Sequence, residues 1–195
     1  MASGAIYDEA PPLGAILVRA GVLFDVIHPT PEAVSFQDIG HALSQVCRYG
    51  GHVSHFYTVA EHSVLLARWF LVRGEIEFAR WALLHDAAEA YVGDVVRPIK
   101  RGLGPWFAMV ERQVARAIFR RAGLPVDHNT SAAEIPPEVL AADDRILADE
   151  VDALFVTGWR PSFQPLGIEI ACWDPCRARC EFDALGRDLF GTRWT

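Results

Sequence analysis

Residues 83–94, LLHDAAEAYVGD, place a histidine and three carboxylates directly after an apolar run. If this stretch is helical, His85 and Glu89 lie four residues apart and Asp86 and Glu89 three apart, so all three side chains share one sector of the helix. Apolar neighbours on both sides indicate that this sector faces inward. Because buried charge is costly unless it is paired or bound to metal, the group requires a cation or a compensating hydrogen-bond network.

Two other segments supply residues of the same kind. His62 lies in VAEHS, and Asp143 lies in LAADDRILADEVDALF, which also presents Glu150 two turns later. Two imidazoles and two carboxylates suit a borderline divalent ion such as Mn, Fe, Co, Ni or Zn, whereas Mg usually takes oxygen ligands. Taken singly, His62 as a surface residue and Asp143 as a solvated charge are the more common situations, so these residues alone do not decide between the alternatives.

The overall composition indicates one globular domain with its own core. The chain has 195 residues, of which 51% are hydrophobic and 22% charged, and its net charge is -7. This acidic balance gives no general attraction to nucleic acid or to an anionic membrane, so we expect neither as a partner. The sequence shows neither a signal-peptide pattern nor an apolar run long enough to span a membrane, and we expect a cytoplasmic protein. Its four cysteines are too few for a disulfide scaffold.

Helical patterns dominate the elements that would position these residues. Ser35 with Asp38, the Thr58-x-x-Glu61 capping box and Pro105 each mark a helix start. We expect a loose arm over 1–14, a short strand or hairpin within 15–29, helices at about 36–49, 58–74, 75–91, 105–122, 137–156 and 175–190, and loops at 93–104, 124–135 and 158–167. The sequence therefore predicts an all-α helical bundle with a short N-terminal β-hairpin, in which facing helices can build a site.

The motifs VAEHS, ALLHDAAEAYVGD followed by RPIK, and AADDRIL occur in this order along the chain. In this order and spacing they resemble the successive motifs of the HD-domain metal-dependent phosphohydrolases, in particular the branch of the YfbR-like 5′-deoxynucleotidases. The resemblance extends over about 36–155. It implies a single HD domain over 1–195, with the N-terminal arm and C-terminal helix flanking that core, and an assembly into dimers or larger homo-oligomers.

The resemblance also implies a role for individual residues. His62, His85, Asp86 and Asp143 would hold a divalent metal ion (Mn, Co, Zn, Fe, Ni or Mg), with Asp144 as the alternative last ligand. Glu89 would be the catalytic carboxylate, and Asp94 a second carboxylate that positions the substrate.

Substrate-binding residues are implied as well. Arg48 resembles an arginine that holds phosphate, and Lys100 lies at a family position in RPIK. Tyr49 stands where the nucleotidases carry Trp, which leaves the sugar selectivity open. His52, after Gly50 and Gly51, is a further candidate for the pocket lining.

The activity implied by the resemblance is hydrolysis of (deoxy)nucleoside 5′-monophosphates with release of phosphate. Two alternatives stay open at this stage. One is a dNTP phosphohydrolase, acting for example on dATP, and the other is a non-catalytic metal-binding module that senses nucleotides. All three predict a small-molecule nucleotide as the ligand.

Overall fold

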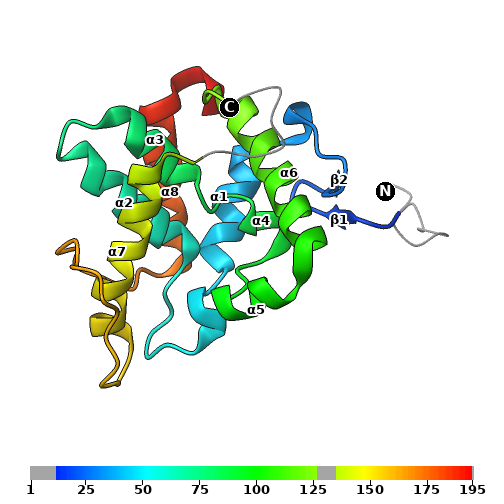
Figure 1. The fold of residues 1–195 in the computed structure, drawn as a ribbon. Coiled ribbons are helices and arrows are strands. Elements are labelled where there is room, and N and C mark those ends of the chain that lie inside the picture. The colour runs from blue at the N-terminus through cyan, green and yellow to red at the C-terminus, as the bar shows by residue number, and fades with distance from the viewer. Residues whose placement is uncertain (1–11, 127–134, 195) are drawn as a thin grey trace.

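Helices dominate the computed structural model, which describes residues 12–126 and 135–194 (Figure 1). The helices are α1 (Phe36–Gln45), α2 (Val59–Leu71), α3 (Ile76–Leu84), α4 (Glu89–Val92), α5 (Arg97–Gly102), α6 (Gly104–Ala122), α7 (Pro137–Leu154) and α8 (Pro175–Phe190). Short 3-10 turns span Pro31–Ala33, Arg48–Gly51 and Gly191–Trp194, and the strands are β1 (Ala15–Leu17) and β2 (Leu23–Asp25). The prediction of an all-α fold with a short N-terminal hairpin is confirmed. Most of the expected arm over 1–14 and of the connection over 124–135 lies outside the described residues.

An aromatic contact and the apolar residues around it join the hairpin to the helical core. β1 and β2 are antiparallel, and Ile16 faces Phe24 across the pair. Phe24 is buried, and its ring stacks on Tyr91 of α4 with the centroids 4.0 Å apart. Burial of this aromatic pair is what stabilises a two-stranded ribbon that would be marginal alone.

Helix α2 occupies the centre of the bundle and contacts α1, α3, α7 and α8. Its start follows the sequence prediction, because the Thr58 hydroxyl accepts a hydrogen bond from Glu61 N at 3.0 Å. In a reciprocal capping box the Glu61 carboxylate would accept a hydrogen bond from Thr58 N. Here it accepts hydrogen bonds from Ala171 N and Trp173 N. This buried carboxylate therefore ties the segment before α8 to the central helix. None of the helices in the described part of the chain is long and apolar enough to cross a membrane.

The single helix expected over 75–91 is wrong, because α3 ends at Leu84 and α4 begins at Glu89. Between them the backbone hydrogen bonds shorten to three-residue spacing, from Ala87 N to Leu84 O and from Glu89 N to Asp86 O. The His85 ring donates to the carbonyl of Ala82 at 2.7 Å, which ties the imidazole to the last turn of α3. The tighter turn changes the direction in which His85 and Asp86 project.

Two other expectations about element boundaries are wrong. The loop expected over 93–104 contains α5, because Pro98 lies in the first turn of a helix, where a missing N–H costs nothing. The helix expected over 36–49 ends at Gln45, since the chain then pairs Cys47 with Thr58 in an antiparallel bridge. Arg48 and the next residues form a separate 3-10 turn, in which Tyr49 has a φ of 59° and Gly50 a φ of 60°.

Candidate metal centre and its pocket

Four side chains from distant parts of the chain converge between α2, α3 and α7. His62 projects from α2, His85 and Asp86 from the turn after α3, and Asp143 from α7, and one ligand atom of each lies within 4.8 Å of all the others. His62 Nε2 is 3.3 Å from His85 Nε2 and 3.1 Å from Asp143 Oδ1. His85 Nε2 is 3.2 Å from Asp86 Oδ2. The structure thus brings together the four residues that the resemblance implied as metal ligands.

The outer partners of the two histidines determine which nitrogen atoms face the centre as acceptors. His62 Nδ1 lies 2.7 Å from Glu150 Oε1, and His85 Nδ1 lies 2.7 Å from Ala82 O. Because both oxygens only accept, each Nδ1 carries the hydrogen in the neutral ring and each Nε2 presents a lone pair to the centre. Asp143 Oδ1 is buried there and has no hydrogen-bond partner among the residues that the structure describes. Nitrogen lone pairs and carboxylate oxygens that face one another fit a divalent metal ion, with the outer hydrogen bonds orienting the ligands.

Protons compete with a metal ion for the imidazole nitrogens at this centre. Burial lowers the pKa of both imidazoles, but neighbouring carboxylates outweigh burial and hold each pKa above its ordinary value. Those carboxylates are Glu150 and Asp143 for His62, and Asp86 and Asp143 for His85. Negative charge around the imidazoles therefore favours a cation, and a bound metal ion takes the place of these protons.

The geometry distinguishes the two adjacent aspartates of α7. Asp143 Oδ1 faces the histidines, while its Oδ2 lies 2.5 Å from Arg97 Nη2. The side chain of Asp144 is 39% exposed and pairs with Arg97 Nη1 at 2.6 Å. The structure therefore places Asp143, and not Asp144, in the cluster.

Glu150 is a fully buried carboxylate that joins three residues behind the cluster. It accepts from His62 Nδ1, from Arg48 Nη2 at 3.4 Å and from the Tyr49 hydroxyl. Burial raises its pKa, but Arg48 and His62 more than offset this effect and lower the pKa to about 2. Sequence reasoning noted Glu150 but gave it no role. The available signal was its position two turns after Asp143, which puts both carboxylates on the same face of α7.

Arg48 and Tyr49 reach the site from the 3-10 turn. Arg48 Nη1 lies 3.2 Å from Asp86 Oδ2, so in this structure the guanidinium pairs with a cluster carboxylate as well as with Glu150. The Tyr49 ring packs edge-on against Phe155 at 5.1 Å. His52, at the end of the same turn, is exposed and does not line the cavity. Three consecutive residues with positive φ, Tyr49, Gly50 and Gly51, turn the chain away before it reaches His52.

Glu89 lies beside the cluster and is only 5% exposed. Burial, together with the charges of Asp86 and Asp94, raises its pKa well above the ordinary value. In the described part of the chain its Oε2 has no hydrogen-bond partner, while Oε1 lies 3.6 Å from Lys100 Nζ. Lys100 also pairs with Glu111 at 2.6 Å. The site thus holds a carboxyl group whose pKa lies well above the ordinary value of a glutamate.

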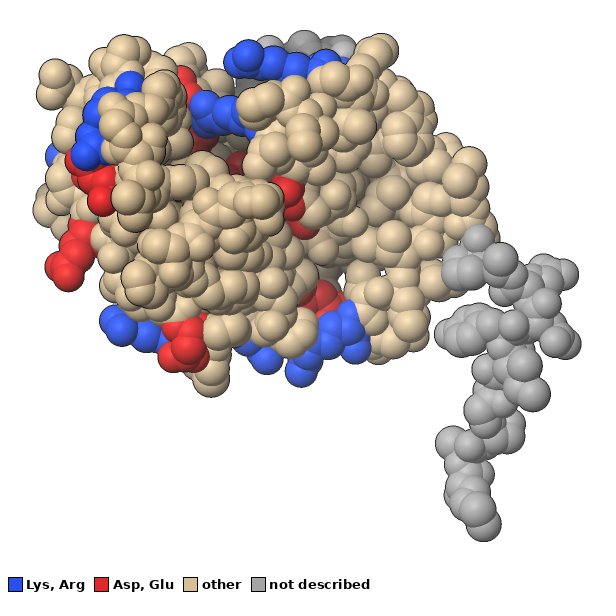
Figure 2. All heavy atoms as spheres, turned by 90° about the horizontal axis from the view of Figure 1, so that it is seen from below, with Lys and Arg blue, Asp and Glu red and all other residues tan. Residues whose placement is uncertain are grey.

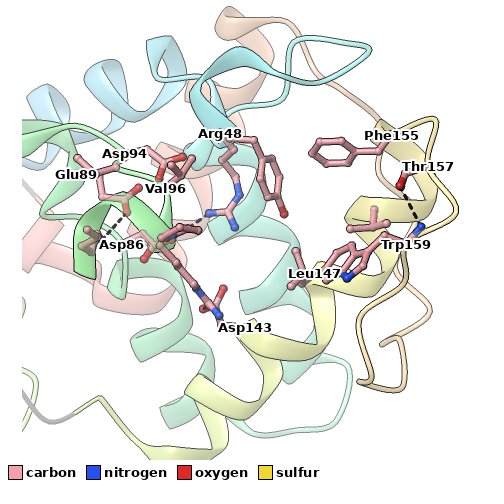
Figure 3. Close-up of a pocket in the computed structure, with 16 residues that line it drawn as sticks. Arg48, Asp86, Glu89, Asp94, Val96, Asp143, Leu147, Phe155, Thr157 and Trp159 are labelled. Atoms are coloured by element: carbon pink, nitrogen blue, oxygen red, sulfur yellow. Dashed lines mark hydrogen bonds and ion pairs between the residues drawn. The ribbon is translucent and has the colours of Figure 1, made fainter. Parts of the chain in front are cut away.

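A cavity of about 450 Å³ opens onto these residues and has two chemically different ends (Figure 3). The polar end is formed by Arg48, Asp86, Glu89, Asp94, Arg97, Lys100 and Asp143. The apolar end is formed mainly by Leu147, Val151, Phe155, Thr157 and Trp159. Seen from below, the surface has a hollow around which basic and acidic side chains gather (Figure 2). One cavity therefore offers charge at one end and apolar surface at the other.

Comparison with known proteins shows that this chain has relatives among bacterial proteins. No protein-family model matches the chain. The chain is 40% identical over 114 residues to the uncharacterized protein YfdR of Escherichia coli, a match that covers 58% of this chain and 61% of YfdR. It is 30% identical over 176 residues to the uncharacterized protein RCAP_rcc00048 of Rhodobacter capsulatus, a match that covers 85% of this chain and 90% of that protein. With a match of this extent, the chain belongs to the family of the Rhodobacter capsulatus protein RCAP_rcc00048.

Proposed function

We propose that this protein is an HD-type metal-dependent phosphohydrolase that releases phosphate from deoxynucleoside 5′-monophosphates. The observation that supports it most is the convergence of the four candidate ligands beside a buried carboxyl group, Glu89, in a cavity that also holds basic side chains. The resemblance of the sequence motifs to HD phosphohydrolases supports the same reaction. His62, His85, Asp86 and Asp143 would hold the ion. When bound, a divalent ion lowers the pKa of a coordinated water and polarises a phosphoryl oxygen.

Glu89 has the properties of a proton-transfer group. Burial raises the pKa of its carboxyl well above the ordinary value, and Oε2, which has no hydrogen-bond partner among the described residues, leaves one oxygen for a reacting group. A carboxyl group with such a pKa can donate its proton to the leaving oxygen. The carboxylate that remains can accept a proton from water. Lys100, 3.6 Å away, is placed to hold the carboxylate when the proton has left.

The charge of a phosphate monoester needs local neutralisation in a protein of net charge -7. Arg48, Arg97 and Lys100 all line the cavity at the metal end. Guanidinium groups bind phosphate oxygens through paired hydrogen bonds, and an ammonium group adds a point charge. The cavity volume of about 450 Å³ lies in the usual range for small-molecule sites.

The test is phosphate release by metal-loaded protein. Chelator-treated protein would be reloaded separately with Mn, Co, Zn, Ni, Fe or Mg and incubated with deoxynucleoside and ribonucleoside 5′-monophosphates and with dATP. We expect orthophosphate from the deoxynucleoside monophosphates and no release by the chelated protein. Pyrophosphate or triphosphate from dATP, without release from monophosphates, would indicate a dNTP phosphohydrolase instead.

Two further outcomes would contradict catalysis altogether. Bound metal and nucleotide-dependent stabilisation without any product would identify a nucleotide-sensing module. Absence of metal in elemental analysis after reloading would mean that the cluster is a structural network of charged groups.

A further inference from the structure

Trp159 presents an open aromatic surface at the apolar end of the cavity. The residue is 58% exposed and lines the cavity at the same end as Leu147 and Phe155, away from Asp86 and Glu89 (Figure 3). A large apolar side chain left open to a cavity is costly in water, and such surfaces mark binding sites when they occur beside convergent polar groups. Helix α7 supplies Asp143 at the metal end and Leu147 at the apolar end, so one helix connects the two.

Thr157 and Tyr49, the polar side chains near this end, each make a hydrogen bond within the protein, and the Thr157 hydroxyl keeps its own hydrogen for a further partner. The Thr157 hydroxyl accepts from Trp159 N at 3.0 Å, and the Tyr49 hydroxyl donates to Glu150. Among the described lining residues, this end therefore offers mainly ring faces and aliphatic surface. Such a surface recognises a flat heterocycle by stacking, which Trp does well.

Two groups of contacts tie the segment that contains Trp159 back to α7. In the first, Arg160 Nε lies 2.8 Å from Asp152 Oδ1, which ties the next residue back to α7. In the second, the Asp149 carboxylate accepts from Leu166 N, Gly167 N and Ile168 N at 2.8–3.0 Å. Both carboxylates belong to α7, the helix that carries Asp143. The segment that carries the indole is thus tied to the helix that supplies Asp143.

We infer that Trp159 is the stacking surface for the nucleobase of the substrate and sets the preference for nucleotides over base-free sugar phosphates. This inference rests on the proposed function, because it takes the phosphate to lie at the metal end of the cavity. It adds a specificity-determining residue that the motifs of the sequence did not indicate.

The test compares Trp159→Ala and Trp159→Phe with Trp106→Ala. Trp106 is the matched control, because it is also 58% exposed but lies on α6 and does not line the cavity. Substrates are dAMP and 2-deoxyribose 5-phosphate, which has the same phosphate and sugar but no base. We expect Trp159→Ala to raise KM for dAMP about tenfold, a factor typical of one lost base–aromatic stack, and to leave KM for the base-free substrate unchanged. Trp159→Phe retains most of the affinity, and Trp106→Ala matches the wild type on both substrates.

A binding measurement separates this inference from the proposed reaction. The same Trp variants would be made in metal-loaded Glu89→Gln protein, and dAMP binding would be measured by calorimetry. If the wild type hydrolyses no phosphoester but dAMP binding still weakens about tenfold with Trp159→Ala, the proposed reaction fails and the stacking role stands. Equal effects of Trp159→Ala on dAMP and on the base-free phosphate, no effect on either, or the same loss with Trp106→Ala would overturn the stacking role.

Discussion

The two ends of the cavity are built in different ways. The metal end is assembled from α2, the turn after α3, and α7, and its two histidines are buried and held by outer hydrogen bonds. The apolar end comes from one face of α7 and the segment that follows it, and Trp159 there is more than half exposed. The positions of the side chains at the metal end are therefore determined by the packing of several helices. Those at the apolar end are determined by α7 and the single segment that follows it. Changes at the two ends should therefore have separable effects.

The largest effect is expected from removing a candidate ligand. Asp143→Asn should reduce bound metal to near zero in elemental analysis and turnover to background, because an amide cannot replace the charge that balances a divalent ion. Asp144→Asn is the matched control, since its carboxylate lies on the next residue and pairs with Arg97 outside the cluster. Equal metal content in both variants would remove Asp143 from the ligand set.

A smaller effect is expected from Glu89→Gln, which keeps the shape of the side chain but cannot exchange a proton. Turnover should fall by about 100-fold or more, as for other general acid–base groups, while metal content stays at the wild-type level. Phosphate release and elemental analysis on the same preparation check both parts. Full turnover in this variant would exclude Glu89 from proton transfer, and loss of metal would show that it acts as a ligand.

A more moderate effect on metal binding is expected from a change at Glu150, which lies behind the cluster. Glu150→Gln removes the charge that holds His62, Arg48 and Tyr49, so metal affinity should fall by roughly 10- to 100-fold, as for other outer partners of metal ligands. Competition with a fluorescent chelator measures this affinity. Glu138→Gln, an exposed change in the first turn of α7, is the control and should leave it unchanged. An unchanged affinity in Glu150→Gln would mean that His62 is positioned by packing alone.

The smallest effect is expected at the anchor of the apolar end. Asp149→Ala removes three hydrogen bonds to backbone N–H groups of 166–168 and should lower the free energy of unfolding by about 1–3 kcal/mol. Because α7 itself is retained, metal content should not change, while KM for dAMP rises a few-fold as the segment that carries Trp159 loses these ties to α7. Urea denaturation and steady-state kinetics test this, with Asp188→Ala, an exposed change on α8, as the control. A loss of metal would show that the two ends are coupled.

Much of the fold could be predicted from sequence, because capping residues and helical periodicity act locally. Thr58 caps α2 as predicted, and Pro137 lies at the start of α7. The grouping of His62, His85, Asp86 and Asp143 was implied by the resemblance of the ordered motifs to HD phosphohydrolases, because the residues taken singly did not decide it.

Other features depend on contacts that a sequence pattern does not contain. The break at His85 involves a hydrogen bond from its ring to the Ala82 carbonyl, and the first turn of helix α5 contains Pro98, which resembled a helix breaker. The buried position of Glu150 and the place of Trp159 in the cavity depend on how α7 and the following segment pack. Tertiary packing decides such positions, and local propensity carries no information about them.

Tyr49 shows where this chain accepts a conformational cost. With a φ of 59°, it occupies the left-handed region that a bulky residue enters at an expense of roughly 1–2 kcal/mol, and that glycine enters freely. Glycine there would relieve the backbone but would remove the hydroxyl from Glu150 and the ring from Phe155. A substitution at position 49 that favours backbone stability would therefore remove side-chain contacts to both the charged and the aromatic ends of the cavity.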